Sequence, residues 1–271
     1  MSHPAETDAA LARRLATEAG VMLVALRADL FGRRLPPWEV MDAGDAAAQR
    51  LIADALAVAR PDDAVLSEEG LEDPRRFVRD RVWIVDPLDG TREYAEVGRV
   101  DWAVHVAVWD HGRFAAGAVA LPAVGRTLVT DPPAPTPRPD RARPVVVSSR
   151  SRMTYATHVV ADALDAHIAL LGSAGAKAMA VVSGEADVYV HAGGMYQWDS
   201  AAPAAVALAA GLHVSRIDGS PIVYNEPDPW LPDLLVCQPA LAERVLDALG
   251  ARNHQPARGG PSDAFDELDR P

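Results

Sequence analysis

The 271-residue chain contains a single cysteine and no apolar run of the roughly 20 residues needed to span a bilayer. The one cysteine, Cys237, excludes an intrachain disulfide, which fits a reducing compartment. Residues 1–10 lack the basic segment and following apolar stretch that are typical of a signal peptide. We therefore expect a soluble protein of the cytoplasm that does not associate with a membrane.

Lysine is also nearly absent, although basic side chains are not. Lysine and arginine together number 26, and Lys177 is the only lysine. Two interpretations are open. An arginine- and alanine-rich composition would by itself remove lysines, or position 177 requires a compact ammonium group that a planar guanidinium cannot replace.

Positive charge is in the minority, and the formal net charge at pH 7 is −12. This balance argues against binding to a nucleic acid polymer or to an anionic membrane. A small anionic substrate remains compatible if a bound metal ion inverts the local charge. The hydrophobic fraction of 49% is sufficient for a folded core, so the chain can form two packed lobes or one layered domain.

The most informative stretch is residues 81–94, where a short β-branched run ends in Asp86-Pro87-Leu88-Asp89-Gly90-Thr91. The run predicts a buried strand, and it places two carboxylates on the turn at the strand's carboxyl end, where α/β proteins commonly build sites. Pro87 fixes one backbone angle, and Gly90 permits a backbone conformation that other residues resist. We therefore expect the turn to be rigid. Two like charges held close together are costly unless a cation lies between them, so the turn predicts a hard-metal site.

The rest of the chain divides at a proline-rich connection, residues 131–144. Before it, we predict helices over residues 8–32 and 43–59, strands over 64–67 and 82–85, and an antiparallel meander over 102–108, 114–121 and 126–129. After it, strands near 145–149, 169–171, 186–191 and 234–237 alternate with helices near 155–164, 177–183, 198–211 and 239–249. The predicted lobes are residues 1–135 and 144–250, followed by a disordered tail over 251–271.

Carboxylates recur at predicted strand exits and helix starts, and the set is Asp45, Glu68, Asp86, Asp89 and Asp199. Separately, Asp45 has a simpler explanation in the dipole of a first helical turn, and Glu68 in a solvated turn. Together, the five favour Mg²⁺, which prefers oxygen ligands. Two such ions would orient and deprotonate a water and stabilise the leaving oxygen of a phosphoryl displacement. His105, within a predicted strand, is interpreted as a packed histidine rather than a ligand.

The Asp-x-Asp-Gly-Thr motif of aspartyl-phosphate phosphatases is an alternative for the central turn. Those enzymes place the two aspartates two residues apart, near the start of the domain, and use the first as a nucleophile. Here Asp86 and Asp89 are three residues apart in the middle of a lobe. The covalent mechanism is therefore disfavoured.

The sequences of two motifs resemble those of a known family. Asp86 to Thr91, and Trp198-Asp199-Ser200-Ala201-Ala202, look like the two signatures of the lithium-sensitive, Mg²⁺-dependent phosphatases related to inositol monophosphatase. Leu66 to Glu69, and Gly172-Ser173 through Lys177, are similar to the CysQ-like 3′(2′),5′-bisphosphate nucleotidases, particularly the actinobacterial branch. The resemblance covers about residues 10–245. It implies an α/β (α+β layered) fold, an αβαβα sandwich with a large antiparallel sheet between helix pairs and a smaller mixed α/β lobe.

The resemblance also implies roles for matching positions. The ligands of two or three Mg²⁺ ions would be Glu68, Asp86, Asp89, Asp199 and the Leu88 carbonyl. Catalysis would involve Thr91, Asp45 and Glu68, with the Thr91 hydroxyl and Asp45 activating the attacking water. Substrate would contact Asp89, Gly90, Thr91, Ser173, Lys177 and Asp199, the Gly90 and Thr91 amides holding the scissile phosphate. Residues that could contact a 5′-phosphate or adenine are Arg92, Arg150, Arg152, His191 and Tyr196.

Two departures from the family pattern concern a third metal ion. The family often has Val-Thr-x-x-Asp before the second helix, where this chain reads Met41-Asp42-Ala43-Gly44-Asp45. The mobile loop before it usually carries a lysine, and here only Arg33 and Arg34 are available. The third ion and loop closure stay open, whereas the core ligands are intact.

The activity that the resemblance implies is hydrolysis of the 3′-phosphate of 3′-phosphoadenosine 5′-phosphate by metal-activated water, in sulfur assimilation. The sulfated analogue is a further candidate substrate, and a homodimer is expected. Inositol monophosphate or fructose 1,6-bisphosphate are the alternative substrates. A non-catalytic, metal-dependent anion-binding regulator is a second class, against which the intact Glu68, Asp86, Asp89, Thr91 and Asp199 argue.

Overall fold

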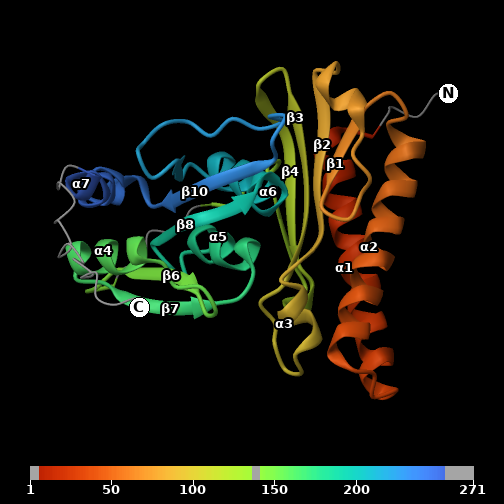
Figure 1. The fold of residues 1–271 in the computed structure, drawn as a ribbon, viewed down its shortest axis with the longest axis horizontal. Coiled ribbons are helices and arrows are strands. Elements are labelled where there is room, and N and C mark those ends of the chain that lie inside the picture. The colour runs from red at the N-terminus through yellow and green to blue at the C-terminus, as the bar shows by residue number, and fades with distance from the viewer. Residues whose placement is uncertain (1–5, 136–140, 254–271) are drawn as a thin grey trace, which may run out of the picture.

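The computed structural model describes residues 6–135 and 141–253, which form five layers of alternating helices and sheets (Figure 1). Helices α1 (Asp8–Gly32) and α2 (Pro37–Ala59) form the first layer. The second is a sheet in the order β1 (Ala64–Ser67), β2 (Arg81–Asp89), β3 (Ala103–Asp110), β4 (Arg113–Leu121) and β5 (Arg126–Val129). Strands β1 and β2 are parallel and the other pairs are antiparallel. This arrangement confirms the predicted meander.

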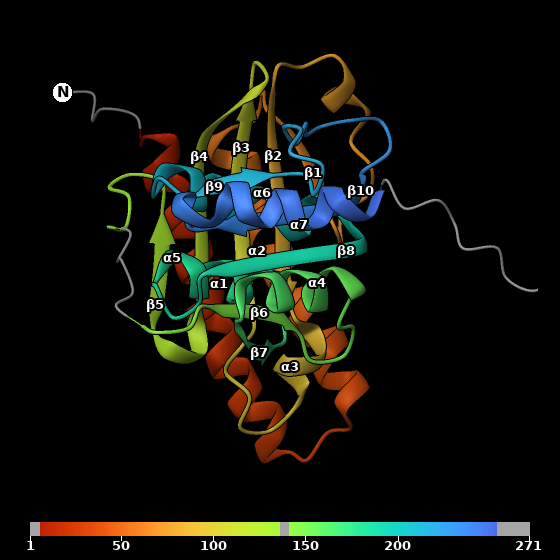
Figure 2. The same ribbon diagram turned by 90° about the vertical axis from the view of Figure 1, so that its left-hand side faces the viewer.

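Two helices, α5 (Ala174–Val182) and α6 (Gln197–Ala209), form the middle layer between this sheet and a second one. The second sheet has the order β7-β6-β8-β10-β9, with bounds β6 (Val145–Ser149), β7 (His167–Leu171), β8 (Val188–Tyr196), β9 (His213–Ser215) and β10 (Trp230–Cys237). Strand β6 is parallel to β7 and β8, and β10 is antiparallel to β8 and β9. Helices α4 (Tyr155–Leu164) and α7 (Ala242–Asn253) cover its outer face (Figure 2).

The alternation of side chains along β2 shows why the first sheet needs helices on both faces. Trp83 and Val85 are buried against α1 and α2, whereas Val82 and Ile84 are buried in the core that α5 and α6 share. Helix α6 is alanine-rich because it is enclosed between two sheets and small side chains allow close approach. At Gly117 of β4, an added Cβ would lie 2.7 Å from the Cβ of Ala205.

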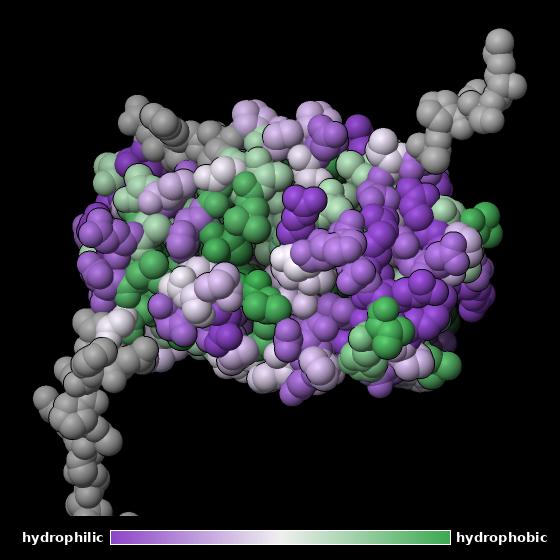
Figure 3. Space-filling model, turned by 90° about the horizontal axis from the view of Figure 1, so that it is seen from above, coloured by the Kyte–Doolittle hydropathy of each residue, from purple (hydrophilic) through white to green (hydrophobic). Residues whose placement is uncertain are grey.

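Short elements complete the chain. Helix α3 (Thr91–Ala95) follows β2, and three single-turn helices are η1 (Pro74–Phe77), η2 (Pro122–Val124) and η3 (Pro239–Leu241). None of the helices in the described parts of the chain is long and apolar enough to cross a membrane. Hydrophilic residues cover most of the right-hand half of the face in Figure 3, where the first sheet and its helices lie.

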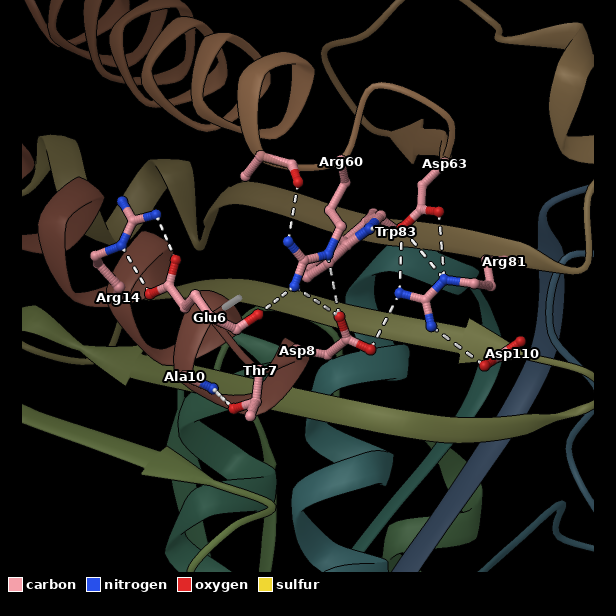
Figure 4. Close-up of polar contacts among 11 residues, drawn as sticks. Glu6, Thr7, Asp8, Ala10, Arg14, Arg60, Asp63, Arg81, Trp83 and Asp110 are labelled. Carbon is pink, nitrogen blue, oxygen red and sulfur yellow. Dashed lines mark hydrogen bonds and ion pairs between the residues drawn. The ribbon is translucent and has the colours of Figure 1, made fainter. Parts of the chain in front are cut away.

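A network of charged side chains joins four elements at one end of the first two layers (Figure 4). Arg81 on β2 lies 3.0 Å from Asp8, 3.2 Å from Asp63 and 3.2 Å from Asp110. Arg60, after α2, pairs with Asp8 at 3.1 Å, and the Trp83 indole N–H donates to Asp63 at 2.8 Å. The network fixes the start of α1 to β2, β3 and the end of α2.

Several predicted boundaries are wrong. Helix α2 begins at Pro37, because proline is well tolerated at the first helical position, so Asp45 lies in the helix interior and not in a first turn. Helix α5 begins at Ala174, where the Ser173 side chain caps it. Helix α6, predicted near 198–211, runs from Gln197 to Ala209 and contains Pro203. Strand β8, predicted near 186–191, begins at Val188 and continues through Gly193 and Gly194 to Tyr196.

The domain division remains a proposal. The chain passes from the first sheet to the second through residues 131–144, of which 136–140 lie outside the described residues. The buried cluster around α5 and α6 draws side chains from both halves, so we propose lobes 1–135 and 144–250 that share one core. The predicted tail began too early, since α7 extends to Asn253, and residues 254–271 lie outside the described part.

Candidate active site

A cleft of about 400 Å³ opens where β2, α3, α5, β8 and α6 meet. Its wall includes seven of the residues predicted as ligands or substrate contacts: Glu68, Asp89, Gly90, Thr91, Ser173, Lys177 and Asp199. These residues come from segments far apart in the sequence. The layered fold thus gathers the two motifs at one place.

Three carboxylates lie together at this cleft. One oxygen from each of Asp86, Asp89 and Asp199 lies within 4.8 Å of the others. Asp86 is fully enclosed; its Oδ1 accepts the Leu88 amide at 3.1 Å, whereas its Oδ2 has no hydrogen-bond partner. Burial, followed by the charges of Glu68 and Asp89, raises the pKa of Asp86 well above its ordinary value. A buried carboxylate oxygen that lacks a donor is costly, so a hard cation fits this cluster.

The turn after β2 has the shape that this crowding requires. The register between β2 and β3 shifts between Asp86 and Asp89, which redirects both carboxylates. Gly90 then adopts φ +87°, and a Cβ there would lie 2.8 Å from the Cβ of Ser173 and 3.3 Å from the Cα of Trp102. Only glycine satisfies both the backbone angle and the close approach.

Asp89 connects the first sheet to helix α5. Its Oδ1 accepts the Ala174 amide at 3.2 Å and its Oδ2 accepts the Gly175 amide at 2.6 Å. His105 Nε2 lies 3.2 Å from the same Oδ2. Burial alone would raise the Asp89 pKa, but His105, the Gly175 amide and Lys177 together lower it. Asp89 therefore stays ionised next to Asp86, whose pKa is shifted in the opposite direction.

His105 is the main residue whose role sequence reasoning missed. It is fully buried, as expected of a packed histidine, but its Nδ1 lies 3.2 Å from the Trp198 carbonyl and its Nε2 faces Asp89. Strand pairing places it directly opposite Asp86. Aligning the predicted strands 82–85 and 102–108 as an antiparallel pair would have supplied that signal.

Glu68 directly follows β1. Because β1 runs parallel to β2, Glu68 lies at the same edge of the first sheet as the turn after β2. Burial at the cleft, followed by the charge of Asp199, raises its pKa to about 7, and the nearby Asp86 side chain opposes the shift. The Glu68 side chain nevertheless remains exposed, so solvent weakens these contributions relative to those at Asp86. The pKa of Asp199 rises to about 6, first through burial and then through the charge of Asp89.

Asp45 approaches the cluster from helix α2. A Cβ at Gly44 would lie 2.7 Å from the Tyr94 ring and 2.8 Å from Leu88 Cδ2, so glycine allows the helix to lie against the turn. Asp45 then contacts the Thr91 hydroxyl, which also lies 3.1 Å from the Leu88 carbonyl. Burial, then the charges of Glu69, Glu68 and Asp42, raises the Asp45 pKa to about 7.

Ser173 and Lys177 also lie at the cleft, but both side chains already make hydrogen bonds to the protein backbone. The Ser173 hydroxyl accepts the Ala176 amide at 2.8 Å as the cap of α5. The Lys177 ammonium donates to the carbonyls of Ser173, at 2.8 Å, and Gly172, and it lies 5.4 Å from the centre of the Tyr189 ring. Only 4% of Lys177 is exposed, and burial lowers its pKa. This enclosed site, with acceptors four and five residues back, suits an ammonium better than a guanidinium.

Arg76 is a second residue that the sequence did not single out. It is 1% exposed, and its guanidinium donates to the carbonyls of Glu226 and Pro227 at 2.9 Å each. Asn225 in turn donates through its side chain to the Arg76 carbonyl at 2.8 Å and through its backbone to Gln197 Oε1 at 2.6 Å. The contacts join the segment after Glu68 to the start of α6, two residues before Asp199.

The carboxylates buried at this cleft are hard oxygen donors. Together they define a metal-dependent site for an anionic substrate. Comparison with known proteins agrees: the inositol monophosphatase family model matches residues 36–253, and the chain belongs to that family. The family is metal-dependent. The resemblance inferred from the two motifs is thereby confirmed.

Comparison with individual relatives shows which members of the family this chain is similar to. The 3′-phosphoadenosine 5′-phosphate phosphatase of Mycobacterium tuberculosis is 47% identical over 242 residues, which cover 86% of this chain and 89% of that protein. The 3′(2′),5′-bisphosphate nucleotidase CysQ of Escherichia coli K12 is 34% identical over 202 residues, covering 70% and 81%. The solved structure of staphylococcal inositol monophosphatase II superposes with a TM-score of 0.74 at 19% identity, covering 90% and 94%. The last comparison confirms the αβαβα fold.

Proposed function

We propose that this protein is a Mg²⁺-dependent phosphatase that removes the 3′-phosphate of 3′-phosphoadenosine 5′-phosphate to give AMP and phosphate. The names of the relatives that are 46–47% identical support the substrate. The observation that carries the chemistry is the buried Asp86–Asp89–Asp199 cluster with its unpartnered Asp86 oxygen. The sulfated analogue is a further candidate substrate.

The ligands proposed for Mg²⁺ are Glu68, Asp86, Asp89, Asp199 and the Leu88 carbonyl. All are hard oxygen donors, which is the ligand type that Mg²⁺ prefers. When bound, the ions supply positive charge that polarises the phosphate and acidifies a water. We propose two ions, with a third depending on Asp42, which lies close enough to raise the Asp45 pKa.

Thr91 and Asp45 are proposed to orient the attacking water. In the structure the Thr91 hydroxyl donates to the Leu88 carbonyl and the Asp45 carboxylate lies beside it. With a metal ion on that carbonyl, the hydroxyl would turn its proton towards Asp45 and accept a hydrogen bond from water. A carboxylate with a pKa of about 7 can hold that proton near neutral pH. The Gly90 and Thr91 amides are proposed to hold the scissile phosphate.

A second phosphate would find positive charge at the same cleft. Arg92 and Arg152 line it and are exposed. Among the described residues, neither has a carboxylate within ion-pair distance. Arg150, by contrast, is paired with Glu93 and Glu96 at 2.6 Å each. We therefore propose Arg92 and Arg152, and not Arg150, as contacts for the 5′-phosphate, which favours a bisphosphate over inositol monophosphate.

Replacing Thr91 tests the water-orienting role. Thr91→Ala should lower kcat by about 10²–10⁴-fold, because the hydroxyl that links the water to Asp45 is lost. Mg²⁺ binding, measured by calorimetry, should remain close to wild type. Thr91→Ser keeps the hydroxyl and should recover most of the activity, and an effect of Thr91→Ala on KM alone would contradict the role.

The raised carboxylate pKa values predict a pH-dependent effect of Mg²⁺ on stability. Asp45, Glu68 and Asp199 have folded-state pKa values of about 7, 7 and 6, above the ordinary values near 4. A raised pKa favours the folded state below pH ~4, and this contribution is lost as pH rises to ~7. Because Mg²⁺ binds the ionised carboxylates, it should raise Tm more at pH 8 than at pH 5. Equal gains in thermal scans at the two pH values would contradict the assignment.

One panel of activity assays decides which substrate is preferred. Phosphate release from 3′-phosphoadenosine 5′-phosphate, inositol 1-phosphate and fructose 1,6-bisphosphate should be compared as kcat/KM, with Mg²⁺, with added Li⁺ and after chelation. We expect the bisphosphate nucleotide to be preferred, Li⁺ to inhibit and chelation to abolish turnover. No release from any of them would favour the non-catalytic regulator. The homodimer and the cytoplasmic location remain predictions.

A further inference from the structure

One part of the cleft wall has no role in the chemistry above. Tyr196 and Trp230 both line the cleft, and 43% and 46% of their surfaces are exposed. Tyr196 is stacked on Trp198, with ring centroids 4.7 Å apart and planes at 13°. Trp230 meets Tyr196 at 83°, with centroids 5.5 Å apart. Since Trp198 covers one face of Tyr196, the rings of Tyr196 and Trp230 form an exposed aromatic corner.

The backbone holds this corner in place. Tyr196 and Trp230 are paired residues of β8 and β10. Gly194, at φ +89°, passes beneath Trp230 so closely that a Cβ would lie 1.7 Å from the indole ring. Glycine at this position therefore leaves the space that the indole fills. Two large rings fixed in this way offer contact area at a small cost in conformational entropy.

The corner is also tied to the carboxylate cluster. Tyr196 lies three residues before Asp199, and its amide donates to Asp199 Oδ2 at 2.6 Å. Arg92 and Arg152, the exposed cations, line the same cleft. A ligand with phosphate at the carboxylates and arginines would thus reach the aromatic corner with its remaining part. The cleft volume of about 400 Å³ is in the range of small-molecule sites.

We propose that Tyr196 and Trp230 form the binding site for the heterocyclic base of the nucleotide. This inference rests on the proposed function and extends it, because it names the feature that separates a nucleotide from inositol and sugar phosphates. Planar bases stack on aromatic rings without regard to their hydrogen-bonding edges. The corner therefore selects for the presence of a base and not for adenine in particular.

Tyr196→Ala and Trp230→Ala test the proposal with two substrates. For 3′-phosphoadenosine 5′-phosphate, each should raise KM by about tenfold or more while kcat changes little. For 1-O-methylribose 3,5-bisphosphate, which has both phosphates and no base, each should change kcat/KM less than about twofold. Tyr196→Phe and Trp230→Phe keep an aromatic ring and should retain most of the affinity.

The adjacent glycines provide a matched pair. Gly194→Ala should displace the Trp230 ring and raise KM for the nucleotide as Trp230→Ala does. Gly193→Ala introduces the same residue at another positive φ, +115°, where nothing lies within 4 Å of the new Cβ. Any effect that both variants share reports backbone strain, so the base site is measured by the difference between them.

Failure of this inference is distinguishable from failure of the proposed function. Calorimetry with AMP measures base binding without turnover, and the alanine variants should weaken that binding about tenfold or more. Equal losses with the nucleotide and the baseless analogue, or unchanged AMP affinity in both alanine variants, would overturn the base site. Absence of phosphate release by the wild-type protein would overturn the proposed function, and the AMP result would still decide the base site.

Discussion

Asp199→Asn is expected to reduce kcat/KM by about three orders of magnitude or more. The substitution removes one of the charges proposed to hold Mg²⁺, and metal ions contribute several kcal/mol to the stabilisation of phosphoryl transition states. The fold should persist, because asparagine can still accept the Tyr196 amide that Asp199 accepts at 2.6 Å. Steady-state kinetics over a range of Mg²⁺ concentrations measure the loss.

The stability of this variant should change in an informative direction. Burial and the charge of Asp89 raise the Asp199 pKa, so the ionised group destabilises the metal-free fold. Without Mg²⁺ at pH 8, Asp199→Asn should therefore have a Tm equal to or above that of wild type, and added Mg²⁺ should raise it less. The exposed Asp162→Asn should change neither quantity. Wild-type turnover in Asp199→Asn would refute the proposed metal site.

Asp89 is a less suitable target, although the sequence alone ranks the two aspartates equally. The Asp89 carboxylate accepts two backbone amides of α5 and faces His105. An asparagine there would direct its NH₂ group at one of these donors. We expect Asp89→Asn to lose stability as well as activity, since it leaves buried donors without acceptors.

Arg76→Met has the second-largest expected effect. It removes the donor from the carbonyls of Glu226 and Pro227 in a buried setting, which should cost about 2–4 kcal/mol of unfolding free energy. For a chain of this size the corresponding drop in Tm is roughly 4–16 °C. Because Arg76 holds the segment after Glu68 against the start of α6, the Mg²⁺ concentration for half-maximal activity should also rise.

Arg75→Met is the matched control for Arg76→Met. Arg75 is the neighbouring arginine of the same 3₁₀ turn, but its side chain is half exposed and pairs with Asp73 at 2.8 Å. An exposed pair contributes little, so the change in Tm should be within about 2 °C. If both variants behave alike in thermal scans and Mg²⁺ titrations, Arg76 has no special role in positioning Glu68.

The sequence predicted those parts of the fold that local pattern determines. The turn after β2 was found because Asp86-Pro87-Leu88-Asp89-Gly90 combines a strand end, a rigid bend and two charges within five residues. Helix α4 and strand β5 match their predicted ranges because both are bounded by clear turn signals. The order of the layers, which no local pattern determines, came from the resemblance of the two motifs to a known family.

Features that depend on distant packing were not predictable in the same way. Gly44 gives no local sign that α2 will lie against Leu88, yet this contact is what brings Asp45 to Thr91. The predicted strand near 186–191 stops before the glycines of β8, whereas the space at Gly194 is used by Trp230, from a strand more than thirty residues later. In both cases the reason for the glycine lies in another element.

The scarcity of cysteine and lysine has a practical consequence for labelling. Cys237 is fully buried and Lys177 is 4% exposed, so the folded protein presents neither a thiol nor a lysine amine to reagents in solution. Burial also raises the pKa of Cys237 to about 12, which leaves its reactive thiolate form scarce at neutral pH. A single cysteine introduced on the surface, for example at Asp162, would thus be a unique side-chain attachment point for a fluorophore. Such a probe would leave every native residue of the active site in place.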